Sequence, residues 1–169
     1  MKRSPMRAKA AGKKAGKEHD ASAEVDRVTQ MVRDRLKESE AVARLDFHVE
    51  RVEKGRAVFL LNVQPKHKQL HGVVHGGVLA TLADTTAAIA CYTAIPEGAE
   101  IATIEMKINF LEAVPGGTIK AEGRVLRAGR NFLVAECDIY NETGSLAAKA
   151  LLTFGAAAGY SLANDRSKA

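Results

Sequence analysis

One stretch of the chain constrains its fold more than any other. Residues 75–93 open with Gly76-Gly77 and continue mainly in Ala, Leu, Val and Thr, with Asp84 as their single charge. The length of about 17 residues and the high alanine content predict a helix that is apolar on most sides. Such a helix should be buried nearly all round, so the rest of the chain has to wrap around it.

The sequence on either side of this helix is expected to supply the surrounding layer. A helix is predicted over residues 22–39, where valine and leucine recur at helical spacing between charged residues. Strand-forming residues then predict strands over residues 44–53 and 56–63, the second ended by Pro65. Four more strands are predicted beyond the buried helix, at about residues 103–110, 119–125, 133–139 and 145–154.

Alternation of apolar and polar residues is clearest in the strand at residues 103–110. Its two faces are expected to carry Ile104, Met106, Ile108 and Phe110 on one side and Thr103, Glu105, Lys107 and Asn109 on the other. Strands and helices do not alternate in the way that a parallel sheet requires. The expected fold class is therefore α+β, with one curved antiparallel sheet wrapped around a central buried helix and an extra helix at the N-terminus.

The positive charge of the chain is concentrated at its start. The net charge is +5, but residues 1–17 hold seven Lys or Arg and no acid, which leaves −2 for the remainder. We expect residues 1–20 to form a disordered basic tail, residues 21–158 a single domain, and residues 159–169 a frayed polar tail. Nucleic-acid binding is not expected as the function, because the folded part is slightly acidic and no helix-turn-helix is visible.

Cysteine and histidine usage indicates where the protein works. Cys91 and Cys137 lie in apolar stretches without metal-binding spacing, so buried, reduced thiols in a cytoplasmic protein are expected. His48, His67 and His71 also lack metal spacing and are expected at the surface or in loops. No apolar run reaches the roughly 18 residues of a membrane span. Neither a metal nor an organic cofactor is expected.

Two features of the apolar helix suggest chemistry. Asp84 could be a structural carboxylate satisfied by neighbouring donors, or a carboxylate retained for catalysis. His75-Gly76-Gly77 could be a plain turn, or a helix start whose free N–H groups bind an oxyanion, with glycine allowing a ligand close to the backbone. Neither feature alone decides between its two interpretations.

The spacing of these residues resembles a known family. The stretch from Gln69 to Asp84 contains His75-Gly76-Gly77, four residues, Leu82, one residue and Asp84. This pattern resembles the signature of hotdog-fold thioesterases, most of all the phenylacetate-degradation (PaaI-like) branch of the superfamily that includes 4-hydroxybenzoyl-CoA thioesterase. The resemblance covers roughly residues 40–156 and implies hydrolysis of an acyl-CoA to a free acid and CoA.

The resemblance also implies roles for individual residues. Asp84 matches the catalytic carboxylate, which acts as nucleophile or as general base on water, and Gly76 matches the glycine whose N–H polarises the thioester carbonyl. Thr103 matches a residue that orients the water. Gln69 stands where many members have Asn, and its amide would hold the carbonyl or the water. His75 matches the motif histidine that shapes the helix entry, and Gly77 would lie against the substrate.

Binding of the CoA phosphates calls for cations near the site. Arg127 and Arg130, with Asn131 beside them, are the candidates, although solvated loop charges would look the same in the sequence.

The spacing of Gly76 and Asp84 predicts an oligomer. Eight residues of helix separate them by about 12 Å, yet both must act within about 3–3.5 Å of one thioester group. One chain cannot easily supply both, so a two-fold dimer with shared sites is expected. The resemblance implies the same, with dimers pairing into tetramers. Two alternatives stay open: a non-catalytic acyl-CoA-binding regulator, and a hotdog hydratase or dehydratase, whose motifs are spaced differently.

Overall fold

The computed structural model describes residues 23–34 and 36–157, and the expected tails at 1–20 and 159–169 lie outside these ranges. A helical segment over residues 23–34 comes first. The remaining elements, in chain order, are α2 (Glu40–Leu45), β1 (Phe47–Glu53), β2 (Arg56–Asn62), the 3₁₀-helix η1 (Pro65–His67), α3 (Gly76–Tyr92), β3 (Ile101–Phe110), β4 (Thr118–Ala128), β5 (Phe132–Tyr140) and β6 (Leu146–Ala156).

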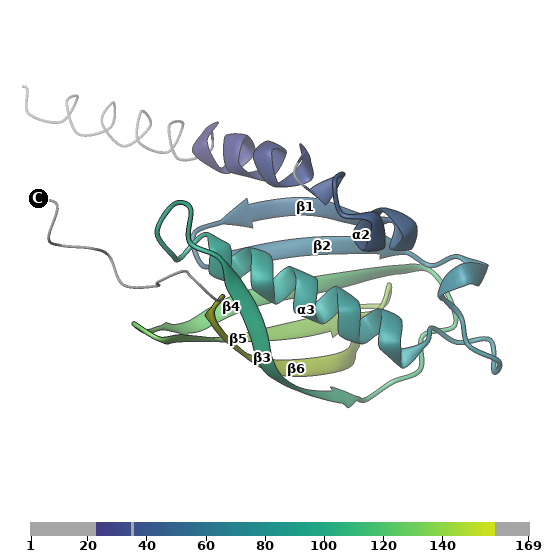
Figure 1. Cartoon of the computed structure of the whole chain (residues 1–169). Helices are drawn as coiled ribbons and strands as arrows, with labels where there is room; N and C mark the ends of the chain where they lie inside the picture. The colour runs from purple at the N-terminus through teal and green to yellow at the C-terminus, as the bar shows by residue number, and fades with distance from the viewer. Residues whose placement is uncertain (1–22, 35, 158–169) are drawn as a thin grey trace, which may run out of the picture.

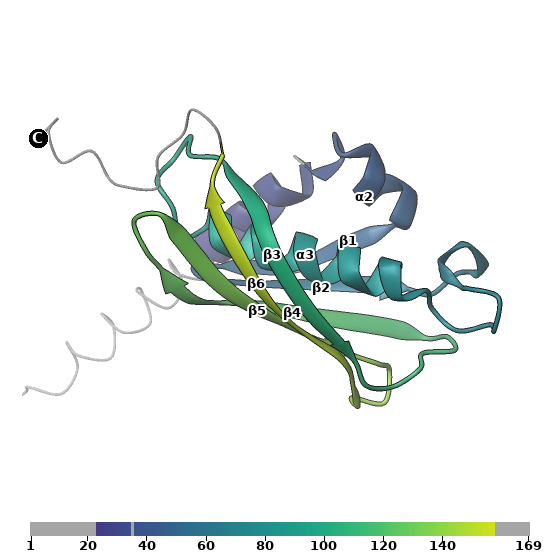
Figure 2. The same cartoon turned by 60° about the horizontal axis from the view of Figure 1, so that its bottom comes forward.

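The six strands form one antiparallel sheet in the order β1-β2-β4-β5-β6-β3. This sheet curves around α3, which lies across its concave face (Figures 1 and 2). The α+β fold predicted from the sequence, with a curved sheet around a long apolar helix and an additional N-terminal helix, is therefore confirmed.

Period-two alternation places the core between the sheet and α3. On β5, Leu133, Ala135, Cys137 and Ile139 are buried while the residues between them are only partly buried. Corresponding residues of β4 and β6 face the same way and are also buried. Both cysteines are buried free thiols, as expected, and burial raises the pKa of the Cys91 thiol to about 12.

Helix α3 approaches β4 so closely that a side chain would not fit between them. A Cβ atom at Gly123 would lie 2.8 Å from the carbonyl oxygen of Thr86 and 3.1 Å from the amide nitrogen of Ala87. The obstacle is helix backbone, which cannot rotate out of the way as a side chain can. Glycine at position 123 therefore sets the depth at which α3 sits in the sheet.

The two edge strands of the sheet, β1 and β3, differ in what lies beside them. The segment 23–34 lies along β1 (Figure 1) and satisfies its free backbone groups with side chains. Thr29 accepts the Val52 N–H at 2.9 Å, and Arg33 donates from Nε to the Val49 carbonyl at 2.9 Å. The other edge, β3, has no strand or helix beyond it in the described part of the chain. An uncovered ten-residue edge strand is a template for pairing with another chain.

A β-bulge interrupts β3 between Thr103 and Glu105. The strict alternation expected for this strand is therefore wrong at its start. Thr103 pairs with inward-facing Phe154, whereas Ile104 lies against Gly155 on the outer face and is 57% exposed. An extra residue in one strand shifts the phase of its side chains, which brings Thr103 to the concave side.

Three further differences separate structure from expectation. The short helix α2 occupies Glu40–Leu45 and includes the first two residues of the strand expected over residues 44–53, which begins instead at Phe47. His67 is fully buried in η1 rather than at the surface, and its Nδ1 accepts the Gln64 N–H at 3.0 Å. Burial lowers its pKa. Lastly, the buried side chains of α3 lie toward the sheet, and the opposite side stays partly open in the single chain, with Thr81 exposed and Ala88 half-buried.

No helix within residues 23–34 and 36–157 is long and apolar enough to cross a membrane.

The contact at Gly123 generates a stability prediction. Gly123→Ala should lower the free energy of unfolding by about 1–3 kcal/mol, because the added methyl group meets helix backbone and forces the helix and sheet apart. Urea unfolding followed by circular dichroism measures the effect. Gly116→Ala is the matched control, since nothing lies within 4 Å of a Cβ there. Equal stability of the two variants would show that α3 can move at no cost.

Candidate active site

The first turn of α3 is capped by the histidine that precedes it. His75 has extended backbone angles, and its Nδ1 accepts the Gly77 N–H at 2.8 Å. Its carbonyl oxygen accepts the N–H groups of Val78 and Leu79 at 2.9 and 3.3 Å. The N–H of His75 itself donates to the His67 carbonyl at 2.8 Å, so three of the four N–H groups that a helix start leaves open, those of His75, Gly77 and Val78, are satisfied. Because Nδ1 is an acceptor, a neutral His75 ring carries its proton on Nε2.

The remaining group is the N–H of Gly76. Among the described residues, no hydrogen-bond acceptor takes it. It lies at the positive end of the α3 dipole and has no side chain to shield it. An unpaired backbone donor in this position can stabilise an oxyanion. Of the two adjacent glycines, Gly76 therefore has the available amide, while the amide of Gly77 is held by His75.

Asp84 lies two turns further along α3 and is half-buried. Thr103 donates a hydrogen bond from Oγ1 to Asp84 Oδ1 at 2.8 Å. The bulge in β3 makes this contact possible, because regular alternation would turn Thr103 to the outer face. The structure thus brings together a carboxylate and a hydroxyl that are 19 residues apart in the sequence.

Gly76 and Asp84 remain separated within one chain. Eight residues of α-helix at about 1.5 Å each place them about 12 Å apart. The structure keeps them on one unbroken helix, so no bend brings them together. Within a single chain the amide and the carboxylate cannot both reach one thioester group.

Gln69 lies in a tight turn before the helix. Its N–H donates to the Val73 carbonyl at 2.9 Å, and its side-chain Oε1 accepts the His71 N–H at 2.9 Å. The carbonyl of buried His67 accepts the His75 N–H at 2.8 Å and ties this turn to the helix start. The side-chain oxygen of Gln69 is therefore engaged locally, which leaves its amide NH₂ as the group that it can offer a ligand.

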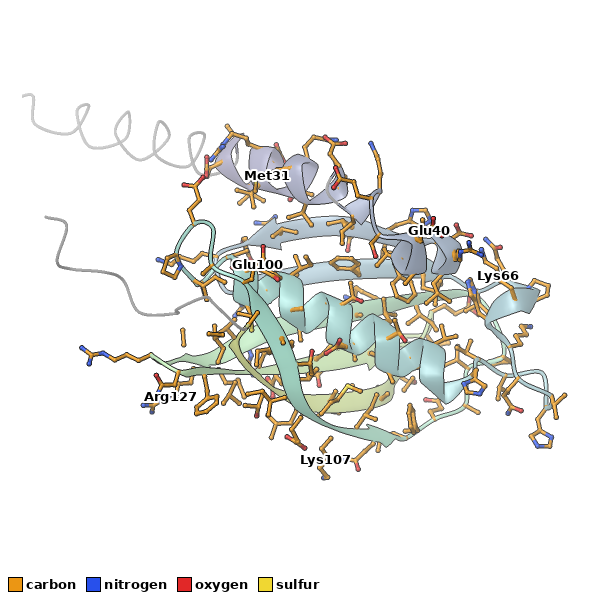
Figure 3. The ribbon with its side chains drawn as sticks, in the orientation of Figure 1. Met31, Glu40, Lys66, Glu100, Lys107 and Arg127 are labelled. Atoms are coloured by element: carbon orange, nitrogen blue, oxygen red, sulfur yellow. The ribbon has the colours of Figure 1, made fainter. Side chains whose placement is uncertain are left out.

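Arg127, Arg130 and Asn131 lie at the β4–β5 hairpin, with Arg130 and Asn131 in the loop (Figure 3 labels Arg127). The strand register connects this hairpin with Thr103 by a row of paired residues, from Ala128 through Leu133 and Phe154. The distance from Ala128 to Thr103 along this row spans three inter-strand spacings, or about 14 Å. The hairpin is thus at the same end of the sheet as Thr103, and its side chains are exposed without touching Asp84.

Phe110, which the sequence did not single out, lies beside Gly76. A Cβ at Gly76 would be 3.2 Å from Phe110 Cζ, at the tip of the ring. The alternation of apolar and polar residues in its strand suggested only that Phe110 belongs to the core. The one available signal was an aromatic side chain at the end of a strand, in a chain with 5% aromatic residues.

The described residues offer little scope for other chemistry. They contain no group of three or more His, Cys, Asp and Glu residues that could hold a metal ion. Burial raises the pKa of both cysteine thiols, so neither is a ready thiolate nucleophile at neutral pH.

Comparison with known proteins identifies the family of the chain. The sequence model of the thioesterase superfamily matches residues 71–148. A Saccharolobus solfataricus protein with a provisional esterase assignment is 37% identical over 107 residues, or 63% of this chain and 76% of that protein. The 1,4-dihydroxy-2-naphthoyl-CoA hydrolase of Listeria monocytogenes is 34% identical over 95 residues, which cover 56% of this chain and 77% of the hydrolase.

The fold agrees as well. The Escherichia coli PaaI protein from the phenylacetic acid degradation operon superposes with a TM-score of 0.72 at 23% identity, over 80% of this chain and 97% of PaaI. At that identity the likeness shows the fold alone. Taken with the sequence matches, it shows that the chain belongs to the thioesterase superfamily, has its hotdog fold and is a thioester hydrolase.

Proposed function

We propose that the protein hydrolyses acyl-CoA thioesters to a free acid and CoA at a site built from Asp84 and Thr103 of one subunit and Gly76 of its partner. The observation that carries the proposal is the unpaired Gly76 N–H on the same helix as the Asp84–Thr103 pair. The CoA hydrolase among the relatives supports this choice of substrate.

Each group has a part in the reaction. The Gly76 amide donates to the thioester oxygen and stabilises the negative charge that forms there during attack. Asp84 takes a proton from the attacking water, or attacks the carbonyl carbon itself, and Thr103 holds the carboxylate in position through its 2.8 Å hydrogen bond. When the C–S bond breaks, CoA leaves as a thiolate and accepts a proton. If Asp84 is the nucleophile, water then hydrolyses the mixed anhydride, which releases the acid and regenerates the Asp84 carboxylate. The NH₂ group of Gln69 and the start of α3 at His75-Gly77 hold the substrate carbonyl and water.

A second copy of the chain would complete the site. The uncovered edge of β3 and the partly open side of α3 adjoin each other, and both carry groups of the site. Antiparallel pairing of two β3 strands about Met106 would place Glu105 opposite Lys107 of the partner subunit, so the edge is complementary in charge to itself. Lys107 points away from α3 (Figure 3), where it does not obstruct the helix.

Other parts of the proposal concern the surroundings of the site. Arg127 and Arg130, with Asn131, would bind the CoA phosphates at the mouth of the site, because guanidinium groups pair well with phosphate. We propose a catalytic domain over residues 21–158 flanked by two tails, with dimers paired into a homotetramer. A reducing cytoplasm would keep Cys91 and Cys137 in the thiol form seen here.

The proposed role of Asp84 can be tested by an isosteric change. Asp84→Asn should lower kcat by about 100-fold to 10,000-fold, because the amide cannot accept a proton or attack a carbonyl. Release of free thiol from a panel of acyl-CoAs is the measurement. Asp138→Asn is the matched control, since this carboxylate lies on the outer face in an ion pair with Lys149. An Asp84→Asn enzyme with full turnover would place the chemistry elsewhere. Acyl-CoA binding by the wild type without thiol release would favour a regulator instead.

Shared sites can be tested by mixing two inactive variants. Asp84→Ala removes the carboxylate, and Gly76→Pro removes the oxyanion donor at the first helix position, where the backbone tolerates proline and the added Cβ lies 3.2 Å from the ring tip of Phe110. In a mixed dimer one site regains both groups and the other loses both, so each mixed dimer should have one active site. Activity is measured after unfolding and refolding the two variants together, with native mass spectrometry to count mixed dimers. Inactive mixed dimers would show that both groups must come from one chain.

A further inference from the structure

Phe110 occupies an unusual place for a large aromatic side chain. It ends β3, pairs with buried Ala148 and so faces the concave side of the sheet, yet 53% of it is exposed. The other side chains facing this way along the strand, Met106 and Ile108, pack against the core. Phe110 thus contributes an apolar surface that the single chain does not bury.

The ring of Phe110 points with its tip at the helix start. Its Cζ, Cε1 and Cε2 atoms lie 3.2, 3.4 and 3.5 Å from where a Cβ of Gly76 would be. These distances put the ring in contact with the backbone of the residue that has the unpaired N–H. A group that accepts a hydrogen bond from Gly76 must therefore fit beside this ring.

The backbone that follows Phe110 is held in place. The N–H groups of Leu111 and Glu112 both donate to the Ala147 carbonyl, at 2.8 and 3.1 Å. The pairing of Phe110 with Ala148 anchors the other side. These bonds hold the backbone from which the ring extends, so the strand end keeps the side chain next to the helix start.

We propose that Phe110 determines acyl specificity: its ring forms the wall beside the Gly76 amide and selects acyl groups that are unbranched at the carbon next to the carbonyl. This inference rests on the proposed function, because it uses Gly76 as the donor to the thioester oxygen. That oxygen lies about 2.9 Å from the amide nitrogen when bonded, and with the acyl side of the thioester turned toward Phe110 the carbon next to the carbonyl passes close to the ring. A straight chain gains apolar contact there, whereas a methyl branch meets the ring.

The test compares an isomeric pair of substrates. For the chain length that the wild type hydrolyses best, kcat/KM is measured for the straight-chain acyl-CoA and for its 2-methyl isomer, such as butanoyl-CoA and 2-methylpropanoyl-CoA. One methyl group against an apolar wall discriminates about 10-fold to 200-fold. We expect the wild type to prefer the straight chain, and Phe110→Ala to reduce that preference about tenfold or more. Phe110→Leu, which keeps an apolar side chain without the ring tip, should fall between them.

The ratio of the two kcat/KM values does not depend on how much enzyme is folded, so a loss of stability or of oligomer in the variant cannot imitate the effect. Phe132→Ala is the matched control: Phe132 is also 54% exposed but lies near Ile104 and Gly155 on the outer face, and its substitution should leave the ratio unchanged. If the wild type is active and Phe110→Ala has the same ratio as the wild type, the specificity role of Phe110 is overturned and the proposed function is not. Wild-type enzyme that releases no thiol from any acyl-CoA overturns the proposed function and this inference with it.

Discussion

Helix α3 and strand β4 meet backbone to backbone, because Gly123 has no side chain to hold them apart. This approach lets the sheet close around the helix and puts the buried face of α3, with Leu82 and Ala87, against the strands. The depth of the helix in turn fixes the height of its outer side relative to β3. If α3 stood further out, Asp84 would lose the hydroxyl of Thr103, and the start of the helix would lift away from Phe110. The site is therefore a consequence of how the core packs.

Neighbouring N–H groups at the start of α3 differ in whether they have a hydrogen-bond acceptor. His75 satisfies three amides, one through its ring and two through its carbonyl, and leaves the Gly76 N–H unpaired. This donor lies at the positive end of a long helix, a place that suits the anionic transition state of the proposed reaction. Fixed donors of this kind need not reorganise during the reaction, which is the reason that such sites are effective.

The two edge strands of the sheet, β1 and β3, also differ in what lies beside them. One edge is covered by the segment 23–34, whose Thr29 and Arg33 bond to the backbone of β1. The opposite edge carries Thr103 and Phe110, and no other element of residues 23–34 and 36–157 lies beyond it. This open edge and the distance between Gly76 and Asp84 along one helix are the two observations that support the proposed pairing with a second copy.

Much of this protein follows from its sequence alone. The apolar stretch with a single Asp84 predicted α3, and period-two alternation predicted the strands, because burial of apolar side chains repeats at the spacing of the local structure. Glycine at position 76 and its spacing to Asp84 also predicted the two ends of the candidate site, and their roles stay a prediction. Three features required the folded chain: the bulge that turns Thr103 toward Asp84, the ring of Phe110 beside Gly76, and the burial of His67. Each arises from contacts between segments far apart in the sequence, and a local pattern records which residues prefer burial but not which partner they meet.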